Sequence, residues 1–305
     1  MNSNQNSVIK MVVILAILFL AVGGVTYMRR SNSQTLTEYT QQQAALRGTN
    51  TESLTTEETD DTASEEKGAV DTKENEEAGS TSIPASNLIG ATLNREIPTE
   101  QITFYTEGFY YAPLSDNLRR YITGISYPNT DEELAISYED LCYVHIWHYN
   151  FDGEPAEGEL ICNQAIAQDL VEIFYALYYH EYQIEKVHLV DEYDGDDIAS
   201  MEANNTSCFN YRLVEGSSSL SRHALGLALD INPYYNPYVT YTQDGSQHVS
   251  PEAAEVYADR SGSFPYKIDE NDLCYQLFTE HGFIWGGNWN SLKDYQHFQK
   301  AIEEK

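Results

Sequence analysis

The chain has 305 residues and a formal net charge of −31, from 48 acidic and 17 basic side chains. This length accommodates one large domain with appendages or two small domains. The charge argues against binding to nucleic acid, because contacts to phosphate groups need clustered Lys and Arg. Four cysteines are too few for a disulfide framework, and no two of them form a CxxC zinc-binding pair.

Residues 1–30 are predicted to be an N-terminal signal anchor that crosses a membrane once. Residues 11–28 carry no charge, and at ~1.5 Å per residue such a helix roughly matches the ~30 Å hydrocarbon core. A secreted chain with a cleaved signal peptide is the alternative, because small residues lie near the end of the apolar run. Arg29 and Arg30 follow the run directly and oppose an orientation that exports the rest of the chain, so the topology depends on what the distal part does.

Residues 31–86 are predicted to be a disordered acidic linker. They are rich in Ser, Thr, Glu and Asp and show no apolar periodicity, so they cannot bury enough apolar surface to offset the entropy of ordering. A flexible coil of this length spans roughly 40 Å on average. Globular composition begins near Ile89, and residues 87–305 are predicted to form the folded domain.

The elements expected in the folded domain mix strands with helices. Residues 141–162 resemble a hairpin that turns at Asp152-Gly153, and residues 163–180 have apolar positions at helical spacing after Asn163 as a cap. A strand over 184–190 and a helix over 272–282 follow. This order predicts an α+β fold in which helices flank a small antiparallel sheet.

Cys142 and Cys162 lie at similar distances from the hairpin turn, so they are predicted to face each other, as free thiols or as an extracytoplasmic disulfide. His145 and His148 are an odd number of residues apart on one strand, which places them on opposite faces and argues against a second metal site. His281 precedes the helix-ending Gly282 and complements the helix dipole there.

The segment SRHALGLALDI, residues 221–231, places His223 and Asp230 at the two ends of a small apolar stretch. Both are metal-ligand types, and Gly226 allows close backbone packing between them. Taken alone, this spacing fits a core histidine and a strand-end aspartate at least as well as a metal site.

A second segment supplies further ligand types. In GFIWGGNW and the DYQHF that follows, His297 can be a third ligand, and Asp294 can lie beside the metal as a general base. Trp285 and Trp289 flank the Gly-Gly turn and either line a substrate groove or pack in the core.

These two segments resemble the paired signatures of zinc D-alanyl-D-alanine carboxypeptidases and of related L-alanyl-D-glutamate endopeptidases of bacterial cell walls. The resemblance covers roughly residues 137–305 and does not extend to residues 1–86. It implies one Zn²⁺ per chain, bound by His223, Asp230 and His297, which activates water for attack on a peptide carbonyl. Asp294 would then be the catalytic acid and base.

The resemblance also implies supporting roles for other side chains. Ser221 matches the signature serine and would contact the substrate or support the ligands. Trp285, on its position beside the Gly-Gly turn rather than on the resemblance, is a further candidate for substrate contact. The family uses an arginine upstream of the first ligand to bind an oxyanion or a substrate carboxylate. Residues 197–200 contain no arginine, so Arg212 is the nearest candidate; a structural ion pair is its alternative role.

The resulting hypothesis is a single-pass zinc metallopeptidase of the bacterial cell membrane, with its catalytic domain outside the cytoplasm and peptidoglycan stem peptides as substrates. Removal of the terminal D-alanine is the leading reaction, and L-Ala-D-Glu endopeptidase cleavage is the alternative with the same chemistry. A non-catalytic, zinc-containing cell-wall-binding domain and a metal-free structural domain are the competing classes.

Overall fold

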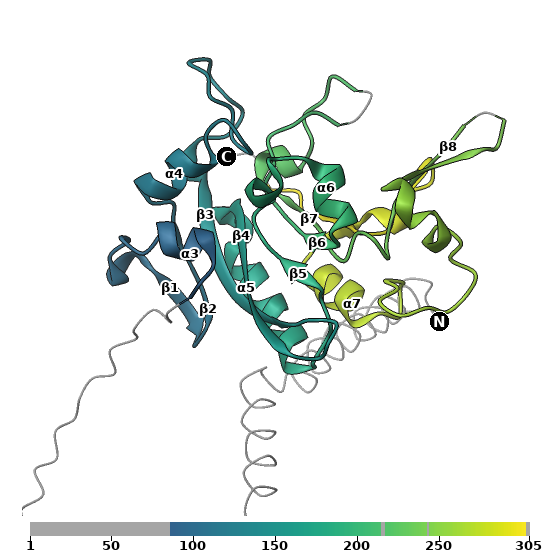
Figure 1. Cartoon of the computed structure of the whole chain (residues 1–305), viewed down its shortest axis with the longest axis horizontal. Helices are drawn as coiled ribbons and strands as arrows, with labels where there is room; N and C mark the ends of the chain where they lie inside the picture. The colour runs from purple at the N-terminus through teal and green to yellow at the C-terminus, as the bar shows by residue number, and fades with distance from the viewer. Residues whose placement is uncertain (1–85, 215–216, 243, 303–305) are drawn as a thin grey trace, which may run out of the picture. The chain divides into compact units, whose positions relative to one another are not determined.

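The computed structural model describes residues 86–214, 217–242 and 244–302, which combine helices with several small sheets (Figure 1). The α+β composition and the antiparallel pairing are therefore confirmed. The predicted anchor and nearly all of the predicted linker lie outside the described residues. Within the described part, the structure contains no helix with the length and apolar character needed to cross a membrane.

The largest sheet has four antiparallel strands in the order β1-β2-β3-β4. Their bounds are Thr103–Thr106, Phe109–Pro113, Leu141–Tyr149 and Pro155–Asn163. Strands β3 and β4 form the predicted hairpin, with Cys142 directly opposite Cys162. The two sulfur atoms are 3.7 Å apart and both thiols are free, so the predicted pairing is present without a disulfide.

Helices cover both faces of this sheet. The predicted helix is α5, Gln164–Tyr179, whose first turn is capped by the Asn163 side chain accepting from the Ala165 N–H. It lies against β3 (Figure 1), and burial of its apolar face is the main stabilising term. The opposite face packs against α3, Ile89–Leu93, and α4, Asp116–Ile122.

The remaining strands form three further small sheets rather than extending one, which corrects the expectation of a single sheet. Two are three-stranded and antiparallel, with the orders β10-β12-β7 and β11-β8-β9. In these orders the bounds are Ile284–Trp285, His297–Gln299, Ala228–Asp230, Leu292–Asp294, Tyr238–Tyr241 and Gln247–Ser250. The predicted helix near the C-terminus is α7, Leu273–Glu280, and it packs against α5.

The predicted strand over residues 184–190 is much shorter than expected. Only β5, Lys186–Val187, is extended and paired, and it pairs in parallel with β6, Asn205–Thr206. The pairing stops because the chain turns into a 3₁₀ helix, Val190–Tyr193, directly afterwards. Helix α6, Asp197–Glu202, follows, with Asp196 as its cap. The other 3₁₀ helices are Thr99–Gln101, Tyr138–Asp140, His223–Leu225, Glu252–Tyr257 and Gly286–Asn288.

The histidines on β3 behave as structural residues. His145 stacks on Tyr110 and hydrogen-bonds the Gly108 carbonyl, whereas His148 hydrogen-bonds the Ile184 carbonyl. Their separate surroundings confirm that they form no common site. His281 is the residue that follows α7, as its position before Gly282 predicted, and it also lies 3.2 Å from the Asp169 carboxylate.

Candidate metal centre

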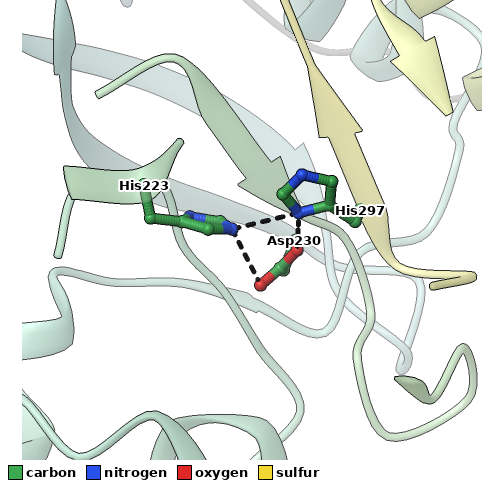
Figure 2. Close-up of side chains that lie close together, drawn as sticks. All are labelled: His223, Asp230 and His297. Carbon is green, nitrogen blue, oxygen red and sulfur yellow. Dashed lines mark hydrogen bonds and ion pairs between the residues drawn. The ribbon is translucent and has the colours of Figure 1, made fainter. Parts of the chain in front are cut away.

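Two segments that are distant in sequence bring His223, Asp230 and His297 together (Figure 2). His223 opens a 3₁₀ helix, and Asp230 ends β7. Strand β12 pairs with β7 so that His297 is the direct partner of Asp230. The structure therefore places the two signature segments side by side, with all three side chains buried and directed at one point.

The distances among the three side chains suit a small tetrahedral cation. Nε2 of His223 lies 3.2 Å from Oδ2 of Asp230 and 3.1 Å from Nδ1 of His297, and Nδ1 of His297 lies 3.0 Å from Oδ1 of Asp230. Ligand bonds of ~2.0–2.1 Å in a tetrahedron separate ligand atoms by roughly 3.3 Å. The donor set, two imidazoles and one carboxylate, is also one that zinc uses in enzymes.

Neighbouring acceptors orient both imidazole rings. Nδ1 of His223 donates to the main-chain oxygen of Cys208 at 2.6 Å, so Nε2 faces the site. Nε2 of His297 donates to Oε1 of Gln299 at 3.1 Å, so Nδ1 faces the site. Such partners fix the ring orientation of a metal-binding histidine and raise its basicity.

Electrostatics also favour a cation here. Burial alone would raise the pKa of Asp230, but the two imidazoles outweigh burial and hold this pKa below its usual range. Burial disfavours the charged form of His297, yet the hydrogen bond to Asp230 prevails and raises the His297 pKa to about 8. The Asp230 carboxylate thus remains ionised, and a bound cation would displace the proton from His297.

Asp294 lies at the edge of this cluster. Its Oδ2 is 4.0 Å from Nδ1 of His297, and its Oδ1 has no hydrogen-bond partner among the described residues. Burial raises the pKa of Asp294 to about 7. A carboxyl group with these properties can take up and release a proton near neutral pH.

Two glycines of the signature segments permit the close packing. At Gly226, φ is +63°, and an added Cβ would lie 2.6 Å from the Asn163 nitrogen. At Gly286, an added Cβ would lie 2.7 Å from both the Cβ and the main-chain oxygen of Asp294. Gly286 therefore allows β11, which carries Asp294, to approach the 3₁₀ helix beside the site, and the predicted packing role of Gly226 is confirmed.

The cluster opens into a pocket of about 370 Å³. Arg212 and Ser221 line it together with His223, Asp230, Asp294 and His297. Aliphatic side chains form another part of the lining: Ile198, Met201, Leu213, Val214, Leu220 and Leu292. The pocket thus combines charged and hydroxyl-bearing side chains with apolar ones, as expected for a small-ligand site.

Arg212 is oriented by Asp197, a residue that the sequence did not identify as its partner. Its Nε forms an ion pair with Oδ2 of Asp197, and Oδ1 of Asp197 accepts from the Asn210 amide at 2.7 Å. Asp196 alone caps α6, whereas Asp197 faces the pocket. Ser221 accepts from the His223 N–H at 3.2 Å, so it supports the first ligand and also lines the pocket.

Trp285 lies elsewhere. It is buried in the apolar core, and its Nε1 donates to the Tyr295 main-chain oxygen at 2.9 Å. The tryptophan that lines the pocket is Trp289, whose ring centroid is 5.4 Å from that of His297. Trp285 therefore packs in the core and does not line the pocket, whereas Trp289 does.

Residues 215–300 match the family model described as D-alanyl-D-alanine carboxypeptidase. This match supports membership in the zinc peptidoglycan peptidase family. It spans the three converging ligand types and Asp294, and thus the whole carboxy-terminal part of the pocket. Searches among curated proteins and among solved structures returned no match. The family match supports a peptidase, and the His-Asp-His group is the part of the described structure that could hold its metal ion.

Proposed function

We propose that the chain is a zinc D-alanyl-D-alanine carboxypeptidase that removes the terminal D-alanine from peptidoglycan stem peptides. The observation that carries this proposal is the convergence of His223, Asp230 and His297 within 3.0–3.2 Å at the wall of a pocket that Asp294 also lines. A structural zinc site is closed by four protein ligands, whereas a catalytic one has three and faces a cavity.

The buried side chains have different proposed roles in peptide hydrolysis. The chemistry that zinc supplies at such a site is Lewis acidity, which polarises a peptide carbonyl and lowers the pKa of water. Asp294 is placed to accept a proton and to pass it to the departing amine, because its pKa lies near neutrality. His223 and His297 hold their ligand nitrogens toward the pocket through their bonds to Cys208 and Gln299.

Arg212 is proposed to bind an oxygen anion of the substrate. Asp197 pairs with its Nε, and its Nη1 donates to the Leu213 main-chain oxygen at 3.5 Å, so Nη2 is the group proposed to bind the oxyanion or a carboxylate. If Arg212 binds a substrate carboxylate, it favours a carboxypeptidase, because this enzyme class must bind a free C-terminus. Ser221 is proposed to support His223 and to contact the substrate.

The proposed location is the outer side of a bacterial cell membrane, with secretion after cleavage as the alternative. The uncharged residues 11–28 support an anchor, and the acidic residues 31–86 support a long tether. Such a tether would let the catalytic domain reach stem peptides in the wall.

Mass spectrometry of products tests the proposal. The zinc-loaded full-length chain is incubated with a muropeptide pentapeptide, alongside His223→Ala. Loss of one terminal alanine, absent with the variant, supports the carboxypeptidase. Cleavage between L-Ala and D-Glu would support the same metal site but identify the chain as an endopeptidase. Binding of zinc without any cleavage would favour the non-catalytic wall-binding domain.

A further inference from the structure

Gln296 is a buried amide in the pocket whose hydrogen-bonding capacity is largely unused. Its side chain lines the pocket, yet the residue is only 3% exposed. Its Oε1 has no hydrogen-bond partner among the described residues, and its Nε2 contacts only the Met201 sulfur, at 3.3 Å. A thioether is a weak acceptor, and a buried amide without partners is costly.

Two other buried amides, those of Asn232 and Asn236, use both ends, whereas Asn204 has an Oδ1 that accepts from the Tyr234 N–H and an Nδ2 without a partner among the described residues. The side chain of Asn232 accepts from the Glu185 N–H and donates to the Gln183 carbonyl. Asn236 accepts from the Ile268 N–H and donates to the Tyr266 carbonyl. Gln296 differs from Asn204 because neither end of its amide meets a nitrogen or oxygen atom and because it lines the pocket, which points to a ligand.

The main chain around Gln296 is held in place. Its carbonyl accepts from the Ile231 N–H at 3.0 Å, directly after the metal-ligand type Asp230. The next residue, His297, is paired with Asp230 across the strands. The main chain at Gln296 is thus held beside the candidate metal centre, while the side-chain nitrogen contacts Met201 of α6.

We propose that Gln296 is a substrate-binding residue whose amide oxygen accepts a hydrogen bond from a main-chain N–H of the bound peptide. This inference deepens the proposed function and rests on it. A peptide in the pocket offers carbonyl and carboxylate oxygens, which suit the metal and Arg212, and N–H donors, which need an acceptor. Gln296 supplies that acceptor without adding charge next to Asp294.

The test measures peptide affinity rather than turnover. Isothermal titration calorimetry is carried out on the full-length, zinc-loaded Asp294→Asn chain with a stem pentapeptide. The same measurement uses two esters of that peptide, in which one of the last two peptide N–H groups is replaced by oxygen. Gln296→Met, which keeps length and removes the amide, is compared with Gln276→Met at an exposed position of α7. Zinc content and the thermal midpoint verify the fold.

The expected result is about tenfold weaker binding of the pentapeptide to Gln296→Met, the loss of one buried hydrogen bond, and unchanged binding to Gln276→Met. On the Asp294→Asn chain with Gln296 intact (the parent), one of the two esters should bind about tenfold more weakly than the pentapeptide. On the Gln296→Met chain, that ester and the pentapeptide should bind with equal affinity. If Gln296→Met discriminates against that ester as the parent does, the inference is wrong, whatever the stability of the variant. Equal affinity of all three peptides for the parent also overturns it.

Hydrolysis by the chain with Asp294 intact separates this inference from the proposed function. If the pentapeptide is cleaved but ester discrimination does not depend on Gln296, the proposed function is supported and the inference about Gln296 is wrong. If the ester binds more weakly only when Gln296 is present, but the pentapeptide is not cleaved, the inference about Gln296 stands and the proposed carboxypeptidase activity is wrong. No binding of any of the peptides to the parent overturns both.

Discussion

His297 and Gln299 lie on the same strand, two residues apart, and are joined by a hydrogen bond of 3.1 Å from Nε2 to Oε1. This bond turns Nδ1 of His297 toward Asp230 and His223. Removing it leaves the ring free to adopt other orientations. We therefore predict that Gln299→Leu lowers zinc affinity about 10- to 100-fold, measured by competition with a chelator of known affinity.

The control for this prediction is Gln276→Leu, which changes the same residue type at an exposed position of α7. It should retain the zinc affinity of the unmodified chain. Equal affinities for the Gln299→Leu and Gln276→Leu variants would mean that Gln299 does not orient the ligand.

Gly286 is predicted to be intolerant of even a methyl group. Its Cβ would lie 2.7 Å from the Cβ and carbonyl of Asp294, so Gly286→Ala must displace Asp294. We expect a fall in kcat of at least about 100-fold, since small misplacements of reacting groups have such effects. The matched control is Gly262→Ala, where no atom lies within 4 Å of the added Cβ. Similar kcat values for the two variants would contradict this account.

Two arginines line the pocket, and only one is predicted to act on the substrate. Arg212 is oriented by Asp197, whereas Arg222 is exposed. Arg212→Ala should lower kcat/KM on the order of 100-fold, typical for the loss of an oxyanion-binding group. Arg222→Ala should change it less than about threefold. The reverse order of effects would assign the role to Arg222.

Glu159 is predicted to make the fold more stable at acidic pH. It accepts from the N–H groups of Gly90 and Ala91 and from the Tyr143 hydroxyl. Burial nevertheless raises its pKa to about 7 from 4.5. The stabilising contribution of the protonated form is complete below pH 4.5 and is lost as pH rises through 7.

The measurement is chemical denaturation of the unmodified chain and of Glu159→Gln between pH 4 and 8. The unfolding free energy of the unmodified chain should fall by about 3 kcal/mol relative to the variant over this range. A difference that is constant with pH would show that the Glu159 pKa is the same in the folded and the unfolded chain.

The ligand set His223, Asp230 and His297 was predicted from the resemblance of two short segments to the signatures of zinc peptidases, since their spacing alone left a structural role open. The hairpin and α5 were predicted from the pattern of apolar and turn-forming residues. The pairing of β7 with β12 places His297 opposite Asp230, and His223 comes from the 3₁₀ helix that precedes β7.

Other parts of the site depend on tertiary contacts that leave no pattern in the sequence. The ion pair between Asp197 and Arg212 joins α6 to a loop, and no spacing rule links the two residues. The partner of His223 is a main-chain oxygen, that of Cys208, which side-chain types cannot reveal. Gln299 could have been found, since residues two apart on a strand share a face. The strand predicted over 184–190 was too long because the local composition does not reveal that the chain turns into a 3₁₀ helix at Val190.

Zinc stoichiometry coupled to peptidase activity tests the central claim most directly. The full-length chain is stripped with a chelator and titrated with Zn²⁺ while hydrolysis of a stem pentapeptide is followed, in parallel with Asp230→Asn and with Asp169→Asn as a control on α5. The account predicts that activity returns in proportion to zinc and saturates at one ion per chain. It also predicts that Asp230→Asn needs far more zinc while Asp169→Asn resembles the unmodified chain. Full activity of the stripped chain, or unchanged zinc dependence in Asp230→Asn, would contradict the account.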